Sequence, residues 1–193
     1  MFPGQPGATH EHVFFGNASV DAFTTPATLL EAQVTTCDGQ TLNRSAYWVP
    51  ALYDGSGERI VYEDPLFYYK TGYHVAAPAI QVPPAGLRMN AGNAAASAPQ
   101  GTEAIQFRCS GWTSDIAWFD PGDPLDHIDI LPDCPENELV EIRIVFPQCW
   151  DGVNLDASDH SSHMAYPSRA VPPVAGTGNC PATHPVVLLE ISY

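Results

Sequence analysis

The stretch from residue 149 to residue 167, CWDGVNLDASDHSSHMAYP, is the densest group of side chains in this chain that can do chemistry. It contains Asp156, Asp159, His160 and His163, together with a cysteine, a tryptophan and a tyrosine. Two histidines three positions apart lie on one side of a helical turn or converge in a tight loop. Because a polar loop that follows a strand often carries the site of a β-rich protein, we expect the functional site here.

Two further segments offer imidazoles to the same site. His10 and His12 are separated by one residue, so an extended strand would point both in one direction. His184 stands just before an apolar run at the C-terminus. Each segment adjoins a predicted strand, and several strands can end at the same end of a sandwich. An isolated pair such as His10 and His12 is more often exposed than functional, so the expectation of one site rests on all three segments together.

A metal site is the first chemistry that fits. Imidazoles are typical ligands of Zn²⁺ and Cu²⁺, and three protein ligands leave one position open for water or oxygen. The candidate ligands are His12, His163 and His184, one from each segment, with Asp156 orienting a ring nitrogen. This hypothesis predicts one zinc or copper ion per chain.

The second chemistry needs no metal. A histidine that an aspartate orients can act as a general base on a polysaccharide, beside a carboxylic acid. The candidates for these catalytic roles are His10, His160, Asp156 and Asp159. The third alternative is structural, with the same side chains forming a hydrogen-bonded network that closes one end of the domain. The sequence contains no GxSxG, GxxxxGK or HExxH motif, so the classic signatures of serine hydrolases, phosphate-loop proteins and zinc proteases are absent.

Four aromatic side chains are candidates for contact with a sugar. Tyr47 and Trp48 lie in an apolar run that predicts a strand, and Trp150 and Tyr166 belong to the stretch 149–167. A ring of this kind can stack on a saccharide. Alternatively, Tyr47 and Trp48 fill the core of the domain, with the hydroxyl group hydrogen-bonded.

The elements that must position these residues are short strands. Apolar and charged residues alternate from residue 139 to residue 146, which predicts the strand that leads into the stretch 149–167. Other apolar runs recur between turns rich in proline and glycine, and Thr25-Pro26 begins a short helix. About eight strands and one or two short helices predict a mostly β fold, a single antiparallel β-sandwich or jelly-roll-like domain over residues 1–193. The longest loop is predicted over residues 110–135.

The charge and the cysteines limit the class of protein to which this chain can belong. The chain has 22 acidic and 7 basic side chains, for a formal net charge of −15. Such a surface repels phosphate backbones, so we exclude nucleic acid as a partner, and no apolar run reaches the roughly 18 residues needed for membrane insertion. Five cysteines without a CxxC pair indicate a secreted, extracellular protein with two disulfides and one cysteine left over. No signal peptide follows Met1, so we expect an incomplete N-terminus without its export signal.

Six runs along the chain resemble a known family. They are PGQPGATHEHVFFGN, LNRSAYWVPALY, GLRMNAGNA, IQFRCSG, FPQCWDGVNLDASDHSSHMAYP and CPATHPVVLLEISY. Together they cover nearly the whole chain and are similar to the secreted family called domain of unknown function nineteen-ninety-six. The run CWDG…LD…DH..HMAYP, followed by CP.THP, is the most distinctive part of the resemblance.

The resemblance implies a setting rather than a reaction. The family occurs in fungi and in bacteria such as actinomycetes, often joined to carbohydrate-binding or wall-associated modules, which implies a polysaccharide or cell-wall glycan as partner. Its motif residues fall on His10, His12, Asp151, Asp156, His160, His163 and His184, with an aromatic motif at Tyr47 and Trp48 and an arginine motif at Arg88. Arg88 is therefore a further candidate for substrate binding. Family members usually carry residues before the PGQPG run, so an edge strand is expected to be missing or supplied by another part of the chain.

We therefore expect a secreted protein that acts on or binds extracellular polysaccharide through its His/Asp-rich site, as a hydrolase, a lyase or a metal-dependent oxidase. The alternative is a non-catalytic wall-binding or assembly module in which the His/Asp cluster is structural. An open site that His160 or His163 reaches would favour the enzyme. The sequons at Asn17 and Asn43 would carry glycans only in a eukaryotic secretory route.

Overall fold

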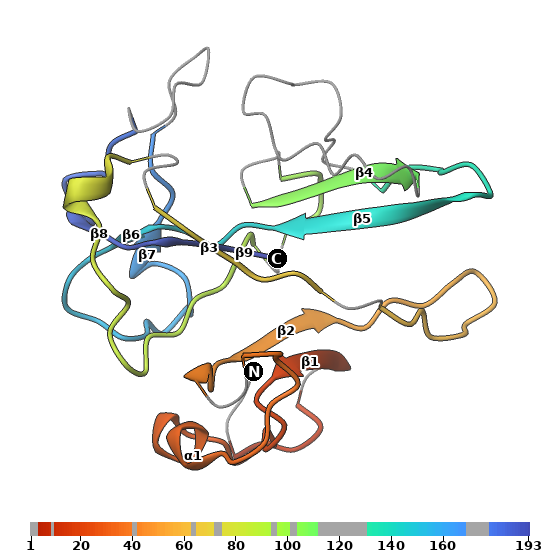
Figure 1. Ribbon diagram of the computed structural model, residues 1–193, viewed down its shortest axis with the longest axis horizontal. Helices are drawn as coiled ribbons and strands as arrows, with labels where there is room; N and C mark the ends of the chain where they lie inside the picture. Colours follow the sequence, from red (N-terminus) through yellow and green to blue (C-terminus); the bar gives the residue numbers. More distant parts are fainter. Residues whose placement is uncertain are drawn as a thin grey trace. The chain divides into compact units, whose positions relative to one another are not determined.

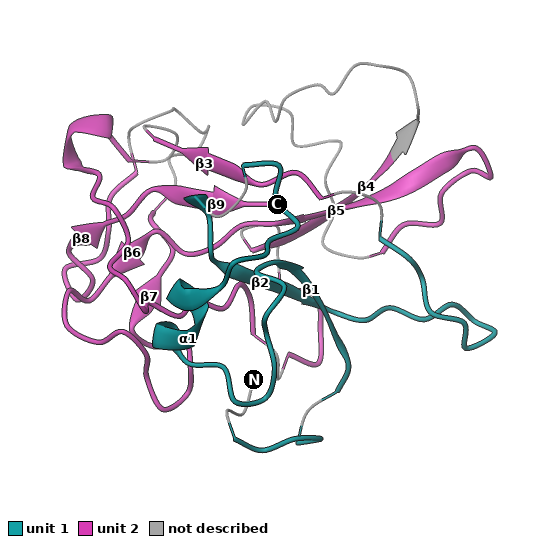
Figure 2. Cartoon of the chain, turned by 60° about the horizontal axis from the view of Figure 1, so that its bottom comes forward, with its two compact units in different colours: residues 1–64 teal, residues 65–193 magenta. Residues whose placement is uncertain are grey.

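The structure is a computed structural model, and it describes residues 4–8, 10–39, 42–62, 65–71, 75–93, 96–100, 104–111, 131–168 and 178–193. The chain divides into two compact units, residues 1–64 and residues 65–193, which Figure 2 colours separately. We call them unit 1 and unit 2. No helix in the described ranges is long and apolar enough to cross a membrane.

Unit 1 is built on an antiparallel pair of strands, β1 (His12–Gly16) and β2 (Ala46–Pro50). Side chains alternate between the two faces of this ladder. Tyr47 of β2 is 7% exposed and belongs to the core of the unit. His12 and Trp48 share the opposite face, which is half-buried.

The short helix of unit 1 is α1 (Pro26–Glu31), and it begins where the sequence predicts. The Thr25 hydroxyl accepts a hydrogen bond from the backbone N–H of Thr28 at 3.3 Å, and the Thr28 hydroxyl accepts one from the N–H of Thr25 at 2.9 Å. These reciprocal bonds form a capping box. No residue of α1 is buried, so its caps stabilise it more than its packing does.

A buried asparagine joins the segments of unit 1. Asn17 is 2% exposed, and its Nδ2 donates hydrogen bonds to the carbonyl oxygens of Leu29 at 3.1 Å and Arg44 at 3.0 Å. Its Oδ1 accepts a hydrogen bond from the N–H of Ser19 at 2.9 Å. A buried amide costs free energy unless its donors and acceptors are paired, and here three segments of the chain supply the partners.

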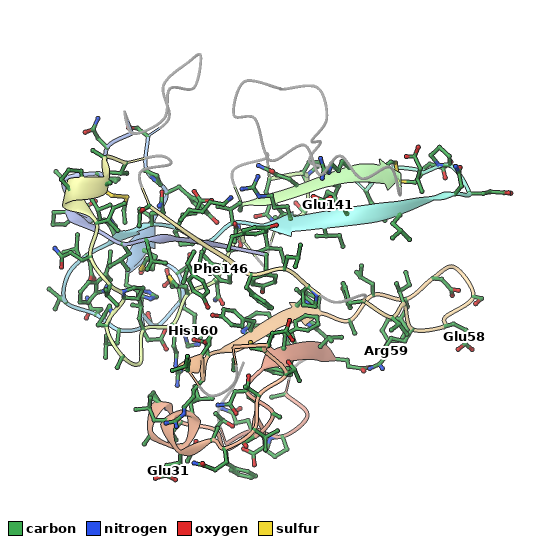
Figure 3. The ribbon with its side chains drawn as sticks, in the orientation of Figure 1. Glu31, Glu58, Arg59, Glu141, Phe146 and His160 are labelled. Atoms are coloured by element: carbon green, nitrogen blue, oxygen red, sulfur yellow. A yellow bond between two sulfur atoms is a disulfide. The ribbon has the colours of Figure 1, made fainter. Side chains whose placement is uncertain are left out.

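The longest element of unit 2 is an antiparallel ribbon of β4 (Ile105–Gly111) and β5 (Glu138–Ile144), seen in Figure 1. Arg108 lies opposite Glu141, and its Nε and Nη2 approach Oε2 of that carboxylate at 2.9 and 2.6 Å. Figure 3 labels Glu141 on this ribbon. The strand predicted from residue 139 to residue 146 is therefore present, although its first residues are exposed.

Three short strands frame the stretch 149–167. β6 (Cys149–Trp150) pairs on one side with β7 (Met164–Ala165) and on the other with β8 (Val186–Val187). The chain leaves the sheet after β6 and re-enters it at β7, so the residues between them form a loop closed at its base. The disulfide between Cys149 and Cys180 joins this base to the segment that carries His184, and Cys149 is fully buried.

The remaining ladder of unit 2 pairs β3 (Tyr68–Lys70) with β9 (Glu190–Ser192). Glu190 is completely buried, and its Oε1 lies 3.6 Å from both Lys70 Nζ and Arg143 Nη2. Burial and the charge of Arg143 lower the pKa of Lys70, although Glu190 opposes this shift. Removing one member of this buried group of charges would leave another charge uncompensated, so the three side chains stabilise the fold as a unit.

The described residues confirm the predicted mostly β fold with short helices. Within the described ranges, the antiparallel strands form four small sheets, accompanied by α1 and a 3₁₀ turn, η2 (Ala77–Ala79). The two expected disulfides are Cys109–Cys134 and Cys149–Cys180, and Cys37 is the cysteine left over. Most of the loop predicted over residues 110–135 lies outside the described residues. The single domain over residues 1–193 and the missing edge strand stay predictions.

Candidate functional site

Two aspartates hold the loop between β6 and β7 in shape. Asp151 Oδ1 accepts hydrogen bonds from two backbone N–H groups at 2.8 and 2.9 Å. Asp159 Oδ1 accepts two more at 3.0 and 2.9 Å, from the residues two and three positions later. Bonds of this kind are the usual way in which aspartate forms turns. Both aspartates therefore shape the loop through its backbone.

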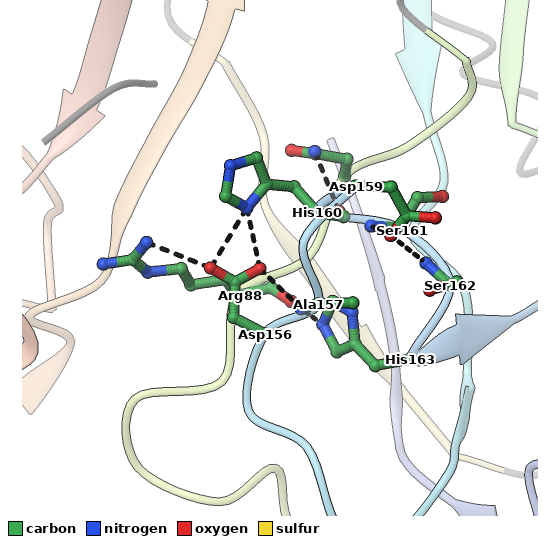
Figure 4. A network of polar contacts seen from close by, with 9 residues as sticks. Arg88, Asp156, Ala157, Asp159, His160, Ser161, Ser162 and His163 are labelled. Atoms are coloured by element: carbon green, nitrogen blue, oxygen red, sulfur yellow. Dashed lines mark hydrogen bonds and ion pairs between the residues drawn. The ribbon is translucent and has the colours of Figure 1, made fainter.

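Asp156 is the centre of a polar network in the same loop (Figure 4). His160 Nδ1 lies 2.9 Å from Oδ1 and 3.1 Å from Oδ2 of Asp156, and Arg88 Nη1 lies 3.1 Å from Oδ2. The side chains of Arg88, Asp156 and His160 are 42%, 28% and 38% exposed, so the network is open to solvent. Because a carboxylate can only accept, Nδ1 of His160 carries the proton, and Nε2 keeps its lone pair when the ring is neutral.

Asp156 and Asp159 both have lowered pKa values. Partial burial opposes ionisation of Asp156, but the hydrogen bond from His160 and the positive charges of His160 and Arg88 outweigh it, so the pKa of Asp156 is lowered. The backbone N–H groups of Ser162 and Ser161 and the Ser162 hydroxyl lower the pKa of Asp159 to about 2. Both groups are therefore carboxylates at neutral pH.

His160 has an unusual backbone conformation. Its φ of 55° is the only positive φ of a residue other than glycine in the part of the chain that the structure describes. The left-handed region costs such a residue about 1–2 kcal/mol. Asn90 Nδ2 donates a hydrogen bond to the His160 carbonyl at 3.0 Å, and the His160 N–H donates to the Ala157 carbonyl at 2.9 Å. Strain that the surroundings maintain in this way is concentrated at functional sites.

His163 lies in the core behind the network. It is 1% exposed, and its Nε2 donates a hydrogen bond to the Arg88 carbonyl at 2.6 Å. Its Nδ1 is buried and has no hydrogen-bond partner among the described residues. The backbone N–H of Arg88 donates in turn to the Leu155 carbonyl at 3.0 Å. Arg88 is therefore fixed to the loop by its main chain as well as by its guanidinium group.

His184 ties the C-terminal segment to the same loop. Its Nε2 lies 3.0 Å from the Ser162 carbonyl, and its Nδ1 lies 2.9 Å from the Thr183 hydroxyl. The carbonyl oxygen can only accept, so Nε2 carries the proton and Nδ1 accepts a hydrogen bond from the Thr183 hydroxyl group. Both ring nitrogens are therefore engaged. The structure thus brings His160, His163 and His184 to one loop of unit 2.

The other two candidate histidines belong to unit 1. The rings of His10 and His12 are 4.5 Å apart between centroids, and His12 meets Trp48 edge to face, also at 4.5 Å. Burial first, and then the charge of His10, lower the pKa of His12, which favours its neutral ring. Because these rings and the loop of unit 2 belong to different units, the expected single site stays a prediction.

The four aromatic candidates occupy different environments. Tyr47 lies in the core of unit 1, and Trp48 is half-buried beside His12. Trp150 is half-buried, and its indole N–H donates to a main-chain carbonyl of the loop at 2.6 Å. The Tyr166 hydroxyl donates to a main-chain carbonyl at 2.7 Å. Of the substrate-binding candidates, Arg88 is the one within the Asp156 network.

A metal centre was the first hypothesis from the sequence. The described ranges hold no group of three or more His, Cys, Asp or Glu side chains that could bind a metal ion. The buried Nδ1 of His163 is a single potential donor, and both nitrogens of His184 have other partners. A zinc or copper ion held by His12, His163 and His184 stays a prediction.

Two important residues were missed from the sequence. Asn90 holds the backbone of His160, but it lies in a run of small residues that gives no signal. Glu190 lies in the apolar run from residue 186 to residue 191, where it is the only charged residue. That isolated charge was a usable signal, because a buried carboxylate requires cations nearby.

The comparisons with known proteins give a family and no reaction. A family model described as "Domain of unknown function (DUF1996)" matches residues 1–193. No curated protein and no solved structure matches the chain.

Proposed function

The chain belongs to the family described as "Domain of unknown function (DUF1996)", and from the geometry of its polar loop we propose an extracellular enzyme that acts on polysaccharide with His160 as general base. The observation that carries the proposal is the pair of Asp156 and His160. Its Nδ1–H bond orients the imidazole, which leaves the basic nitrogen Nε2 for a substrate or a water molecule.

Each residue of the network has a distinct part in this proposal. His160 takes a proton through Nε2, and the carboxylate of Asp156 stabilises the imidazolium ion that results. Arg88 places a positive charge beside the Asp156–His160 pair, where it can stabilise negative charge that develops on a substrate. Asn90 and His163 are positioning residues, since they hold the main chains of His160 and Arg88.

The extracellular and polysaccharide parts of the proposal rest on the disulfides, the family resemblance and the charge of the chain. Two disulfides are typical of proteins that mature in an oxidising compartment. The family resemblance implies a setting of carbohydrate-binding and wall-associated modules. A net charge of −15 favours neutral or cationic polymers over polyanions.

The test compares the protein with its His160→Gln and Asp156→Asn variants on a panel of polysaccharides and cell-wall fractions, with released products identified by mass spectrometry. We expect products from the parent protein and a loss of about 10²–10⁴-fold in rate for His160→Gln. The matched control is Arg59→Gln, because Arg59 pairs with Glu11 at 3.1 Å on the surface of unit 1, as Arg88 pairs with Asp156. Figure 3 labels Arg59.

The non-catalytic module stays the second candidate, and one observation favours it. Asp151, Asp159, His163 and His184 all form hydrogen bonds with main-chain groups, so many of the polar side chains in and beside the loop maintain its shape. Binding of a glycan that His160→Gln leaves unchanged, without any product, would support this candidate and contradict the enzyme.

A further inference from the structure

We propose that the bond cleaved at this site is an acyl ester on a hydroxyl group of a neutral polysaccharide. The inference rests on the proposed function, because it takes His160 as the base and Arg88 as its cationic neighbour. It adds the class of bond and the charge of the polymer, which follow from three separate observations.

The first observation concerns the carboxylates. Hydrolysis of a glycosidic bond by a carboxylate pair uses one carboxylic acid, with a raised pKa, to protonate the leaving oxygen. The two carboxyl groups nearest His160 in the loop have pKa values shifted the other way. Asp156 is shared by two cations, and Asp159 is committed to two backbone N–H groups. The group of this network that can both take up and return a proton is therefore His160.

The second observation is the placement of Arg88 beside His160. Arg88 Nη1 and His160 Nδ1 both lie 3.1 Å from the same oxygen, Oδ2 of Asp156. Only Nη1 of the guanidinium group has a partner among the described residues, so its other N–H groups can donate to a substrate oxygen. A base and a cation on one carboxylate suit a reaction in which negative charge develops next to the site of proton transfer. Ester hydrolysis is such a reaction.

The third observation is the charge of the whole chain. The net charge of −15 raises the electrostatic cost of bringing a polyanion to the surface. That disfavours the polyuronates whose carboxylate groups an elimination reaction requires. An ester-substituted neutral polymer has no such cost.

The reaction balances with water as the only co-reactant. A water oxygen attacks the ester carbonyl carbon while Nε2 of His160 accepts the water proton. The carbonyl oxygen becomes an oxyanion, which Arg88 stabilises. The bond between the carbonyl carbon and the sugar oxygen then breaks, and the imidazolium ion returns the proton to the sugar oxygen. The products are a free sugar hydroxyl and a carboxylic acid.

The test uses acetylated xylan and acetylated glucomannan, with the same polymers after chemical deacetylation. Three products are measured in parallel: acetate, new reducing ends, and the absorbance near 230 nm of unsaturated uronates. The proteins compared are the parent chain, His160→Gln, Arg88→Gln, Arg88→Lys and Arg59→Gln. We expect acetate release by the parent protein, a loss of at least about 100-fold in His160→Gln and Arg88→Gln, partial rescue in Arg88→Lys, and no change in Arg59→Gln.

The outcomes separate the two proposals. Acetate release that depends on His160 supports both. Reducing ends or unsaturated products that depend on His160, without acetate, overturn the ester assignment and leave His160 as the catalytic base. No product from any polymer, or products that His160→Gln forms as fast as the parent, overturns both. Melting temperatures of all variants distinguish a lost function from a lost fold.

Discussion

At the scale of single residues, the carboxylate of Asp156 connects every charged part of the site. His160, Arg88 and the backbone of Ala157 all donate to it. Removing one donor therefore changes the ionisation of Asp156 and the orientation of the other two groups at once. This coupling gives a measurement that does not depend on knowing the substrate.

We predict that Arg88→Gln raises the pKa of Asp156 towards its ordinary value, since it removes one of the charges that lower it. A carboxyl group with a lowered pKa in the folded state contributes stability above its unfolded pKa, and this contribution disappears as the pH falls through the folded pKa. In the variant, the stability that Asp156 contributes should therefore disappear at a higher pH than in the parent protein. Carboxyl ¹³C NMR titration and acid unfolding measure the two effects, with Arg59→Gln as control. An unchanged titration of Asp156 would show that Arg88 does not act on it.

A second prediction concerns the strained backbone of His160. Asn90→Asp keeps the size of the side chain but removes the Nδ2–H group that donates to the His160 carbonyl. We expect a cost of about 1 kcal/mol in the free energy of unfolding and a larger fall in activity, because the imidazole loses its fixed orientation. Denaturant unfolding and rate measurements on the same preparation check this. If Asn90→Asp loses neither stability nor activity, while Asn90→Ala loses both in the same proportion, then packing and not the hydrogen bond holds the loop.

The sequence predicts which of these residues share a loop better than it predicts what each one contacts. The spacing of Asp156, His160 and His163 predicts that they share one loop, because short polar segments between strands form loops, and they do lie together between β6 and β7. It does not separate half-buried His160 from fully buried His163, since burial depends on contacts with residues such as Arg88, distant in the chain. The sequence also groups Asp159 with Asp156, although Oδ1 of Asp159 accepts from the backbone N–H groups of the residues two and three positions later.

At the scale of elements, the base of the loop is the feature that matters most. β6 lies between β7 and β8, and the Cys149–Cys180 disulfide links it to a third segment. The predicted strand over residues 186–191 is divided here between β8 and β9. An apolar run indicates that a segment is extended and buried, but its partners in a sheet depend on the rest of the chain. The division of this run between β8 and β9 was therefore not predictable.

We predict that the double variant Cys149→Ala/Cys180→Ala loses about 3 kcal/mol in the free energy of unfolding, since this disulfide spans 31 positions of the sequence. It should also lose activity, because the base of the loop is no longer fixed. Denaturant unfolding and the rate on a reactive substrate measure both. The matched control is Cys109→Ala/Cys134→Ala, which opens a loop of similar length at the β4–β5 ribbon. Equal activity in the two double variants would contradict a special role for the Cys149–Cys180 disulfide.

At the scale of the whole molecule, the cysteine arrangement can be counted directly. We predict that iodoacetamide labels one cysteine of the denatured, unreduced chain and all five after reduction. The single label should map to Cys37, which is half-buried. Intact mass and peptide mapping give the answer. Three or more labels before reduction would mean that at least one disulfide does not form.

The burial of Asn17 has a consequence for biosynthesis. An oligosaccharide can be transferred to this asparagine only while the chain is still unfolded, since its amide is enclosed once the carbonyl groups of Leu29 and Arg44 accept from it. In a host with a glycosylating secretory pathway, sugar transfer and folding therefore compete for the same nitrogen. A chain modified there keeps a bulky group where the core of unit 1 must close. The yield of native protein should thus depend on how fast this segment folds after it enters the lumen.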